Sequence, residues 1–139
     1  MTWLLDANVL IALCTPDHVD HTRASNWYHS EKNRSFATCP ITQGALIRFQ
    51  LRFGRGIRAG QAWRLVTAVC AFPGHEFWPD DLNFKDVSSR GILGHRRVTD
   101  AYLVALAAKH KGRVATMDEG LFALHTAESM LIPRLKVSR

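Results

Sequence analysis

Long hydrophobic runs and paired cysteines are both missing from this sequence of 139 residues. No apolar stretch approaches the roughly 20 residues that span a bilayer, so the sequence predicts no transmembrane helix. The N-terminus has neither a basic region before its first apolar run nor a small-residue cleavage site, which argues against a signal peptide. We therefore expect a cytoplasmic protein that does not associate with a membrane.

Cysteine is scarce, with residues only at positions 14, 39 and 70. The number is odd and no two of them have CxxC spacing, which does not fit a disulfide framework. Each cysteine lies among apolar neighbours, so we expect three buried free thiols. Free thiols are typical of a reducing compartment such as the cytoplasm.

Internal repeats, low-complexity tracts and linkers are also absent, and the length suits a single domain over residues 1–139. What is present in excess is positive charge: 18 Lys and Arg against 12 Asp and Glu give a net charge of +6. Most of these cations are arginine, which suits planar contacts with phosphate. The excess is consistent with a nucleic-acid partner without demonstrating one.

Hydrophobic patterning and turn signals predict strands that alternate with helices. We expect strands at residues 2–6, 35–39, 76–78 and 113–117, with a further edge strand near Ile132. We expect helices at residues 7–14, 19–32, 41–53, 61–72, 99–111 and 119–124, and a short helix within the polar stretch 80–94. This order is typical of an α/β domain with a parallel sheet covered by helices on both faces.

Three separated acids lie at the edges of these elements. Asp6 ends the first strand, Asp118 follows the strand at 113–117, and Asp100 lies at the head of a helix that Thr99 is expected to cap. Taken singly, each acid could be a turn or helix-end residue. Taken together at the carboxyl ends of parallel strands they would converge, and converging carboxylates repel unless a cation neutralises them. The pattern predicts a site for Mg²⁺ or Mn²⁺, which prefer oxygen ligands.

Three segments carry a resemblance to a known family. Residues 4–10 (LLDANVL), 98–103 (VTDAYL) and 115–118 (ATMD) resemble, in order and separation, the three acidic motifs of PIN-domain nucleases. The match runs over essentially the whole chain. In its small size and its lack of further domains, the chain most resembles the VapC toxins of toxin–antitoxin pairs. This resemblance implies a three-layer α/β/α domain with a central parallel sheet.

The resemblance also implies a function, the toxin component of a type II toxin–antitoxin system. Such a protein would be an endoribonuclease that cleaves RNA phosphodiesters through metal-activated water, with Mg²⁺ or Mn²⁺ as cofactor. Asp6, Asp100 and Asp118 would be its catalytic metal ligands, while Asn8 and Thr116 would shape the site by hydrogen bonding. Its expected partners are the RNA substrate, a small cognate antitoxin and a second copy of the chain.

One position departs from the family pattern. PIN-domain nucleases usually carry a further Glu in the helix after the second strand, and this sequence has Gln43 there. An amide oxygen can contact a metal, but it carries no charge and cannot act as a base. A second hypothesis therefore remains open, a catalytically weak PIN-like domain that binds RNA or regulates. A haloacid-dehalogenase-like phosphatase is disfavoured, because that chemistry needs an acid where Asn8 stands.

Several basic and aromatic residues are candidates for contacts outside the acidic site. Arg96 and Arg97, just before Asp100, and Arg48 in the third helix are candidate RNA-binding residues, although solvated helix faces would explain them equally well. Trp63 and other aromatic residues at helical spacing are expected in the core or in a dimer surface. Trp78 could stack on a base, but core packing is favoured.

Overall fold

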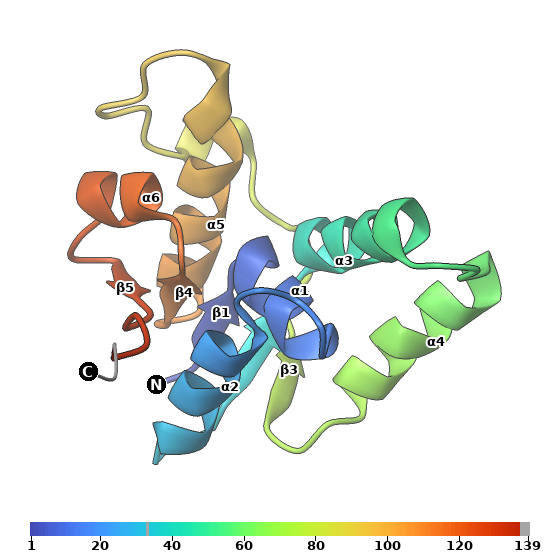
Figure 1. The fold of residues 1–139 in the computed structure, drawn as a ribbon. Coiled ribbons are helices and arrows are strands. Elements are labelled where there is room, and N and C mark those ends of the chain that lie inside the picture. Colours follow the sequence, from blue (N-terminus) through green and yellow to red (C-terminus); the bar gives the residue numbers. More distant parts are fainter. Residues whose placement is uncertain (33, 137–139) are drawn as a thin grey trace.

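The computed structural model describes residues 1–32 and 34–136 and contains a five-stranded parallel sheet in the order β3-β2-β1-β4-β5 (Figure 1). The strands are β1 (Trp3–Leu5), β2 (Phe36–Thr38), β3 (His75–Phe77), β4 (Arg113–Thr116) and β5 (Ser129–Leu131). The helices are α1 (Ala7–Cys14), α2 (His21–Ser30), α3 (Pro40–Phe53), α4 (Ala59–Cys70), α5 (Val98–Lys109) and α6 (Glu119–Leu124). Two 3₁₀ turns, η1 (Phe84–Asp86) and η2 (His95–Arg97), interrupt the connection from β3 to α5.

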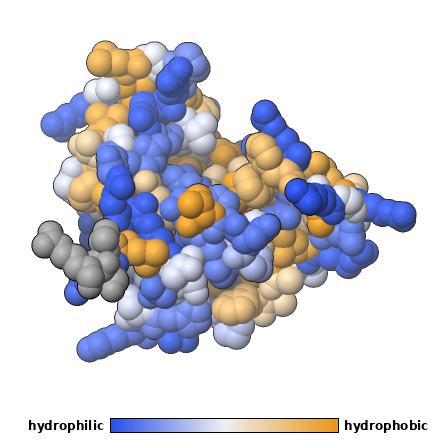
Figure 2. All heavy atoms as spheres, viewed as in Figure 1, coloured by the Kyte–Doolittle hydropathy of each residue, from blue (hydrophilic) through white to orange (hydrophobic). Residues whose placement is uncertain are grey.

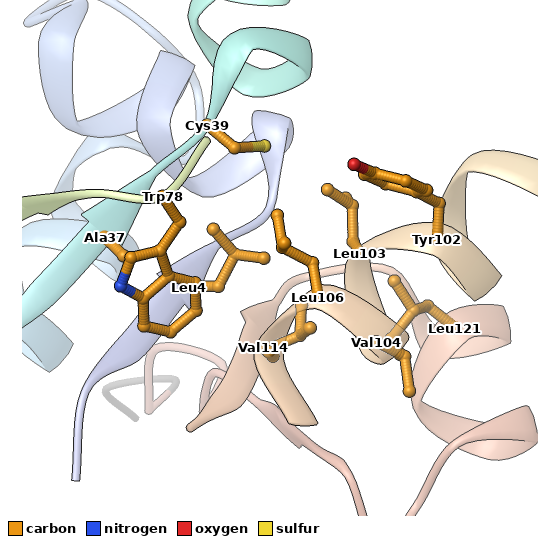
Figure 3. Close-up of a cluster of buried hydrophobic side chains, with 11 residues drawn as sticks. Leu4, Ala37, Cys39, Trp78, Tyr102, Leu103, Val104, Leu106, Val114 and Leu121 are labelled. Atoms are coloured by element: carbon orange, nitrogen blue, oxygen red, sulfur yellow. The ribbon is translucent and has the colours of Figure 1, made fainter. Parts of the chain in front are cut away.

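The central strands bury side chains on both faces, because successive residues of a strand point to opposite sides. On one side, Leu4 packs in a core with α5, and Figure 3 shows Leu103 and Leu106 of that helix turned toward Leu4 and Trp78. On the other side, Trp3 and Leu5 pack in a second core with residues of α1, α2 and α3. The predicted α/β/α three-layer architecture is confirmed.

Helices α3 and α4 form a hairpin that extends beyond the sheet (Figure 1). Only Ala62 is buried in α4, and the side chains of Phe53 and Trp63 are 61% and 56% exposed. Figure 2 shows hydrophobic and hydrophilic residues interleaved over this part of the surface. Core burial therefore does not explain Trp63.

The connection from β3 to α5 agrees with two local predictions and contradicts a third. Trp78 is buried and its indole stacks on the His110 ring at 4.4 Å between centroids, so it is a core residue. The short helix expected within residues 80–94 is the 3₁₀ turn η1. The N-cap assignment of Thr99 is wrong: η2 runs directly into α5, so Arg97 holds the N-cap position and Thr99 lies in the first turn.

The prediction of three buried thiols is confirmed for Cys39, holds in part for Cys14 and is wrong for Cys70. Cys39 is buried and Cys14 is half-buried, but Cys70 is exposed at the end of α4. Apolar neighbours in the sequence do not guarantee burial on α4, where Ala62 is the one buried residue. None of the helices formed by the described residues is long and apolar enough to cross a membrane.

Candidate active site

The strand order places two of the three acids next to each other. From β1 the chain builds β2 and β3 on one side and later adds β4 and β5 on the other, so the direction of winding reverses between β1 and β4. Ligands of open α/β sheets bind in the crevice at such a reversal, outside the carboxyl ends of the strands. Asp6 directly follows β1, and Asp118 follows β4 after one intervening residue. Two of the three predicted acids, Asp6 and Asp118, therefore follow adjacent strands at the centre of the sheet.

Asp6 is a buried carboxylate with partners for both oxygens. Its Oδ1 accepts a hydrogen bond from the Ala7 N–H at 2.8 Å and thereby caps α1. Its Oδ2 accepts from Thr116 Oγ1 at 2.7 Å and from Asn8 Nδ2 at 3.3 Å. Burial raises the pKa of Asp6 and outweighs the hydrogen bonds that lower it, with a further rise from the charges of Asp100 and Asp118. The three carboxylates are thus close enough to interact electrostatically.

Asn8 and Thr116 connect the segment after β1 to the segment after β4. Thr116 Oγ1 donates to Asp6 and accepts from the Asp118 N–H at 2.9 Å. Asn8 Oδ1 accepts from the Met117 N–H at 3.2 Å. These bonds fix the spacing of the two acids, which is the hydrogen-bonding role that the sequence predicts for Asn8 and Thr116.

Asp118 also serves as a helix cap. Its Oδ1 accepts from the backbone N–H groups of Gly120 and Leu121, at 2.8 and 3.2 Å, at the start of α6. Partial burial acts to raise the pKa of Asp118, but these hydrogen bonds and the neighbouring Arg97 outweigh it and the pKa is lowered. With Oδ1 held by the backbone, Oδ2 is the oxygen that contacts Arg97.

Arg97 lies between the two less buried acids. Its Nη1 is 3.0 Å from Oδ2 of Asp100 and 3.0 Å from Oδ2 of Asp118. The hydrogen bond to Asp100, followed by that to Asp118, raises the pKa of Arg97. The residue expected to contact RNA therefore contacts the carboxylates. The sequence signal for this contact is the three-residue spacing of Arg97 and Asp100, since such pairs are neighbours on a helix surface.

These residues fit a divalent cation by chemistry and by charge. Among residues 1–32 and 34–136, no three acidic, histidine or cysteine side chains are gathered closely enough to hold a metal as they stand. However, Asp100 and Asp118 already direct one oxygen each at a single positive group, Nη1 of Arg97. Carboxylate oxygens are the ligands that Mg²⁺ and Mn²⁺ select. The donor set is therefore suited to such an ion once the arginine moves.

Three other predicted site residues do not contact the acids in the described structure. Gln43 donates from Nε2 to Thr38 Oγ1 at 3.0 Å and to Cys70 Sγ at 3.5 Å, toward β2 and the end of α4. Arg48 and Arg96 are exposed on α3 and η2. Their positions leave them available to a partner or a polyanion.

The sequence interpretation missed one residue, Gly120. A Cβ added there would lie 2.1 Å from Nη2 and 2.6 Å from Cζ of Arg97. The absence of a side chain at position 120 gives the guanidinium the space to lie beside Asp118. A glycine two residues after a capping acid is the only sequence signal for this contact.

Comparisons with known proteins identify the family of this chain. The PIN domain family model matches residues 3–125. The chain is 51% identical to Ribonuclease VapC29 of Mycobacterium tuberculosis, covering 96% of this chain and 98% of that one. It is 40% identical to Ribonuclease VapC39 of the same organism, covering 87% and 91%.

A solved structure supports the fold independently. The structure described as FitAB bound to an IR36 DNA fragment contains a chain that superposes with a TM-score of 0.70, covering all of both chains at 21% identity. Identity at this level indicates a shared fold and nothing further. With a family match over most of its length and close relatives over almost all of it, the chain belongs to the PIN-domain family and, within it, to the VapC-type ribonucleases.

Proposed function

We propose that this protein is the toxin of a type II toxin–antitoxin system and acts in the cytoplasm as a Mg²⁺- or Mn²⁺-dependent endoribonuclease. The observation that carries the proposal is the placement of Asp6 and Asp118 after the adjacent strands β1 and β4, where the sheet reverses its winding, with Asp100 joined to Asp118 through Arg97. The VapC ribonucleases that this chain resembles over nearly its full length support the choice of RNA as substrate.

In the proposed site, Asp6, Asp100 and Asp118 hold the cation directly or through water. A bound divalent cation would stabilise charge on the phosphate and lower the pKa of a water molecule. Thr116 and Asn8 orient Asp6, and the amides of α6 orient Asp118. Because water supplies the attacking oxygen and the P–O bond to the leaving oxygen breaks, the ribose 2′-hydroxyl is not needed as nucleophile. RNA is then selected by shape and by contacts along its backbone.

Arg96 and Arg48 are proposed phosphate contacts. Both are exposed, and Arg96 lies directly before the segment that carries Arg97 and Asp100. Arginine forms planar, paired hydrogen bonds with phosphate oxygens. Neutralising either residue is expected to weaken RNA binding without altering the carboxylates.

The proposal is tested by RNA cleavage with purified protein. Asp6→Asn and Asp100→Asn should each lower the cleavage rate by at least roughly a hundredfold, since each removes a charge from the cation site. EDTA should stop cleavage and added Mn²⁺ should restore it. Asp86→Asn is the matched control, because Asp86 is an exposed acid in η1 whose ion-pair partner is Lys85.

A melting curve separates loss of chemistry from loss of fold. The raised pKa of Asp6 means that ionising this carboxyl costs stability as pH rises through the folded-state value. Asp6→Asn removes that cost, so at neutral pH the variant should melt at the wild-type temperature or above. Undiminished cleavage by both variants would refute the assignment of the site. RNA binding without metal-dependent cleavage would favour the second hypothesis, a catalytically weak RNA-binding domain that carries Gln43.

A further inference from the structure

We propose that Arg97 is a resident counter-cation of the acidic site, which a divalent metal must displace from Asp100 and Asp118 in order to bind. This inference rests on the proposed metal-dependent function and adds a device that sets how much metal the site requires. It concerns the side chain alone, because the backbone at Arg97 is fixed by the junction of η2 and α5.

The contact geometry makes Arg97 and a metal mutually exclusive. One nitrogen, Nη1, lies 3.0 Å from Oδ2 of both Asp100 and Asp118. A Mg²⁺ ion needs such oxygens at about 2.1 Å, which leaves no room for a nitrogen hydrogen-bonded to the same pair. A guanidinium and a divalent cation at that separation would also repel each other strongly.

The guanidinium can leave without disturbing the core. The Arg97 side chain is 33% exposed, so it needs only rotation into solvent. Its position depends on Gly120, where any Cβ would overlap Nη2 and Cζ. This dependence provides a way to displace the guanidinium from the acids while keeping its charge in the protein.

Removing Arg97 from the acids has two linked consequences. Without the arginine, Asp100 and Asp118 repel each other and the metal-free protein loses stability. For the same reason, the site then binds a cation more tightly, because no resident charge has to be displaced. Both effects come from the same contact between the arginine and the two acids. Removing that contact should therefore raise the affinity for the metal and lower the stability of the metal-free protein.

Mn²⁺ binding to metal-stripped protein, measured by isothermal titration calorimetry, tests this inference without reference to activity. Arg97→Gln should bind Mn²⁺ roughly tenfold more tightly than wild type. Arg96→Gln removes the same charge from the neighbouring exposed residue and should change the affinity by no more than about twofold.

Gly120→Ala provides a second, charge-neutral arm. It should also tighten Mn²⁺ binding, because the new Cβ excludes the guanidinium from its place beside Asp118. Gly60→Ala is its control: Gly60 is likewise a helical glycine beside an arginine, but a Cβ there would meet Arg64 Nη1 at an ordinary 3.5 Å. This arm keeps the inference testable even if Arg97→Gln does not fold.

Thermal melting supplies the reciprocal measurement. In EDTA, Arg97→Gln should melt below wild type, and saturating Mn²⁺ should remove that difference. Equal Mn²⁺ affinities for wild type, Arg97→Gln and Gly120→Ala would overturn the role of Arg97 and leave the proposed function intact. Failure of wild type and all variants to bind Mn²⁺ would overturn the metal-dependent function itself, and this inference with it.

Discussion

At the scale of single residues, Asp6 and Asp118 each combine a structural and a chemical role. Each carboxylate uses Oδ1 to accept backbone N–H groups at the start of a helix, and each turns Oδ2 toward other side chains of the site. The helix-cap interpretation and the metal-ligand interpretation of these acids are therefore compatible. Capping fixes the orientation of the carboxylate, which is what a metal ligand needs.

Gln43 is the position where this chain departs from the family pattern. We predict that Gln43→Glu lowers the Mg²⁺ concentration needed for half-maximal RNA cleavage, because it would restore the family's fourth acidic charge. The same change removes the hydrogen bond that Gln43 Nε2 donates to Thr38 Oγ1. The variant should therefore melt a few degrees lower than wild type. Titration of cleavage rate against Mg²⁺, together with a melting curve, measures both effects.

Gln43→Met separates charge from hydrogen bonding. Methionine has a similar length and neither donates to Thr38 nor carries charge, so it should lower the melting temperature without changing the metal requirement. A metal requirement that Gln43→Glu leaves unchanged or increases would mean that position 43 is adapted to Thr38 and Cys70 and not to the acids.

The three cysteines should differ sharply in reactivity. Cys70 is exposed, Cys39 is buried, and burial raises the pKa of the Cys14 thiol to about 11. At pH 8 the thiolate fraction of Cys14 is on the order of one in a thousand, so it should react slowly. We predict one fast and two slow thiols in a titration with Ellman's reagent. Cys70→Ser should abolish the fast phase, and a fast phase that persists would contradict the exposed position of that residue.

At the scale of elements, the end of α5 carries backbone strain that the sequence does not reveal. Gly112, the glycine that follows the predicted helix at residues 99–111, has its N–H bonded to the Ala107 carbonyl at 2.8 Å, but the residue with positive φ is Lys111, at 58°. A non-glycine residue in this conformation costs roughly 1 kcal/mol. Gly112 is needed for a different reason: a Cβ there would lie 2.4 Å from the Thr2 carbonyl oxygen.

We therefore predict that Lys111→Gly stabilises the fold by about 1 kcal/mol. Lys111→Ala, which loses the same charge but keeps a Cβ, should not share this gain. Gly112→Ala should be destabilising by a few kcal/mol, because backbone must move to relieve the contact. Urea unfolding at neutral pH distinguishes the three variants, and a Lys111→Gly protein no more stable than Lys111→Ala would show that the positive φ carries no cost.

At the scale of the whole molecule, the α3–α4 hairpin presents apolar and basic side chains together. Phe53 and Trp63 are more than half exposed, and the hairpin and its turn also carry exposed arginines at positions 48, 52, 55, 58 and 64. An apolar area rimmed by charge is typical of a protein interface. The proposed homodimer would use the apolar side chains, and acidic residues of a small antitoxin would pair with the arginines.

We predict that the protein is a homodimer and that Trp63→Glu weakens it without unfolding the protomer, since Trp63 is outside the core. Leu93→Glu is the matched control, because Leu93 is 91% exposed in the connection before α5. Size-exclusion chromatography with light scattering should show a shift toward monomer for Trp63→Glu alone. A wild-type protein that is monomeric at all concentrations would contradict the homodimer prediction.

The same measurement, made on protein co-expressed with the product of the neighbouring reading frame, tests the antitoxin. The expected result is a larger complex with inhibited RNA cleavage. Absence of binding would leave a PIN-domain ribonuclease and remove the toxin–antitoxin interpretation.

Local sequence by itself determined most of the elements and the three acids of this protein. Short apolar runs closed by turn residues specify the strands, and a carboxylate at the end of β1 or β4 needs no distant information to be recognised. Alternation of strands and helices was sufficient to predict the parallel sheet. The resemblance of three short motifs to PIN-domain nucleases was sufficient to predict the family, which the comparisons confirm.

Only the tertiary structure decided which charges meet. The ion pairs of Arg97 with Asp100 and Asp118 depend on the packing of α5 against β4, on the start of α5 at Val98 and on the space left by Gly120, and these come from parts of the chain that pack together only in the fold. The same holds for Trp63, whose exposure follows from the extension of the α3–α4 hairpin beyond the sheet, and for Cys70, which is exposed at the end of α4. Periodicity identifies the apolar side of a helix, but burial requires a partner surface, and the path of the whole chain decides where that surface lies.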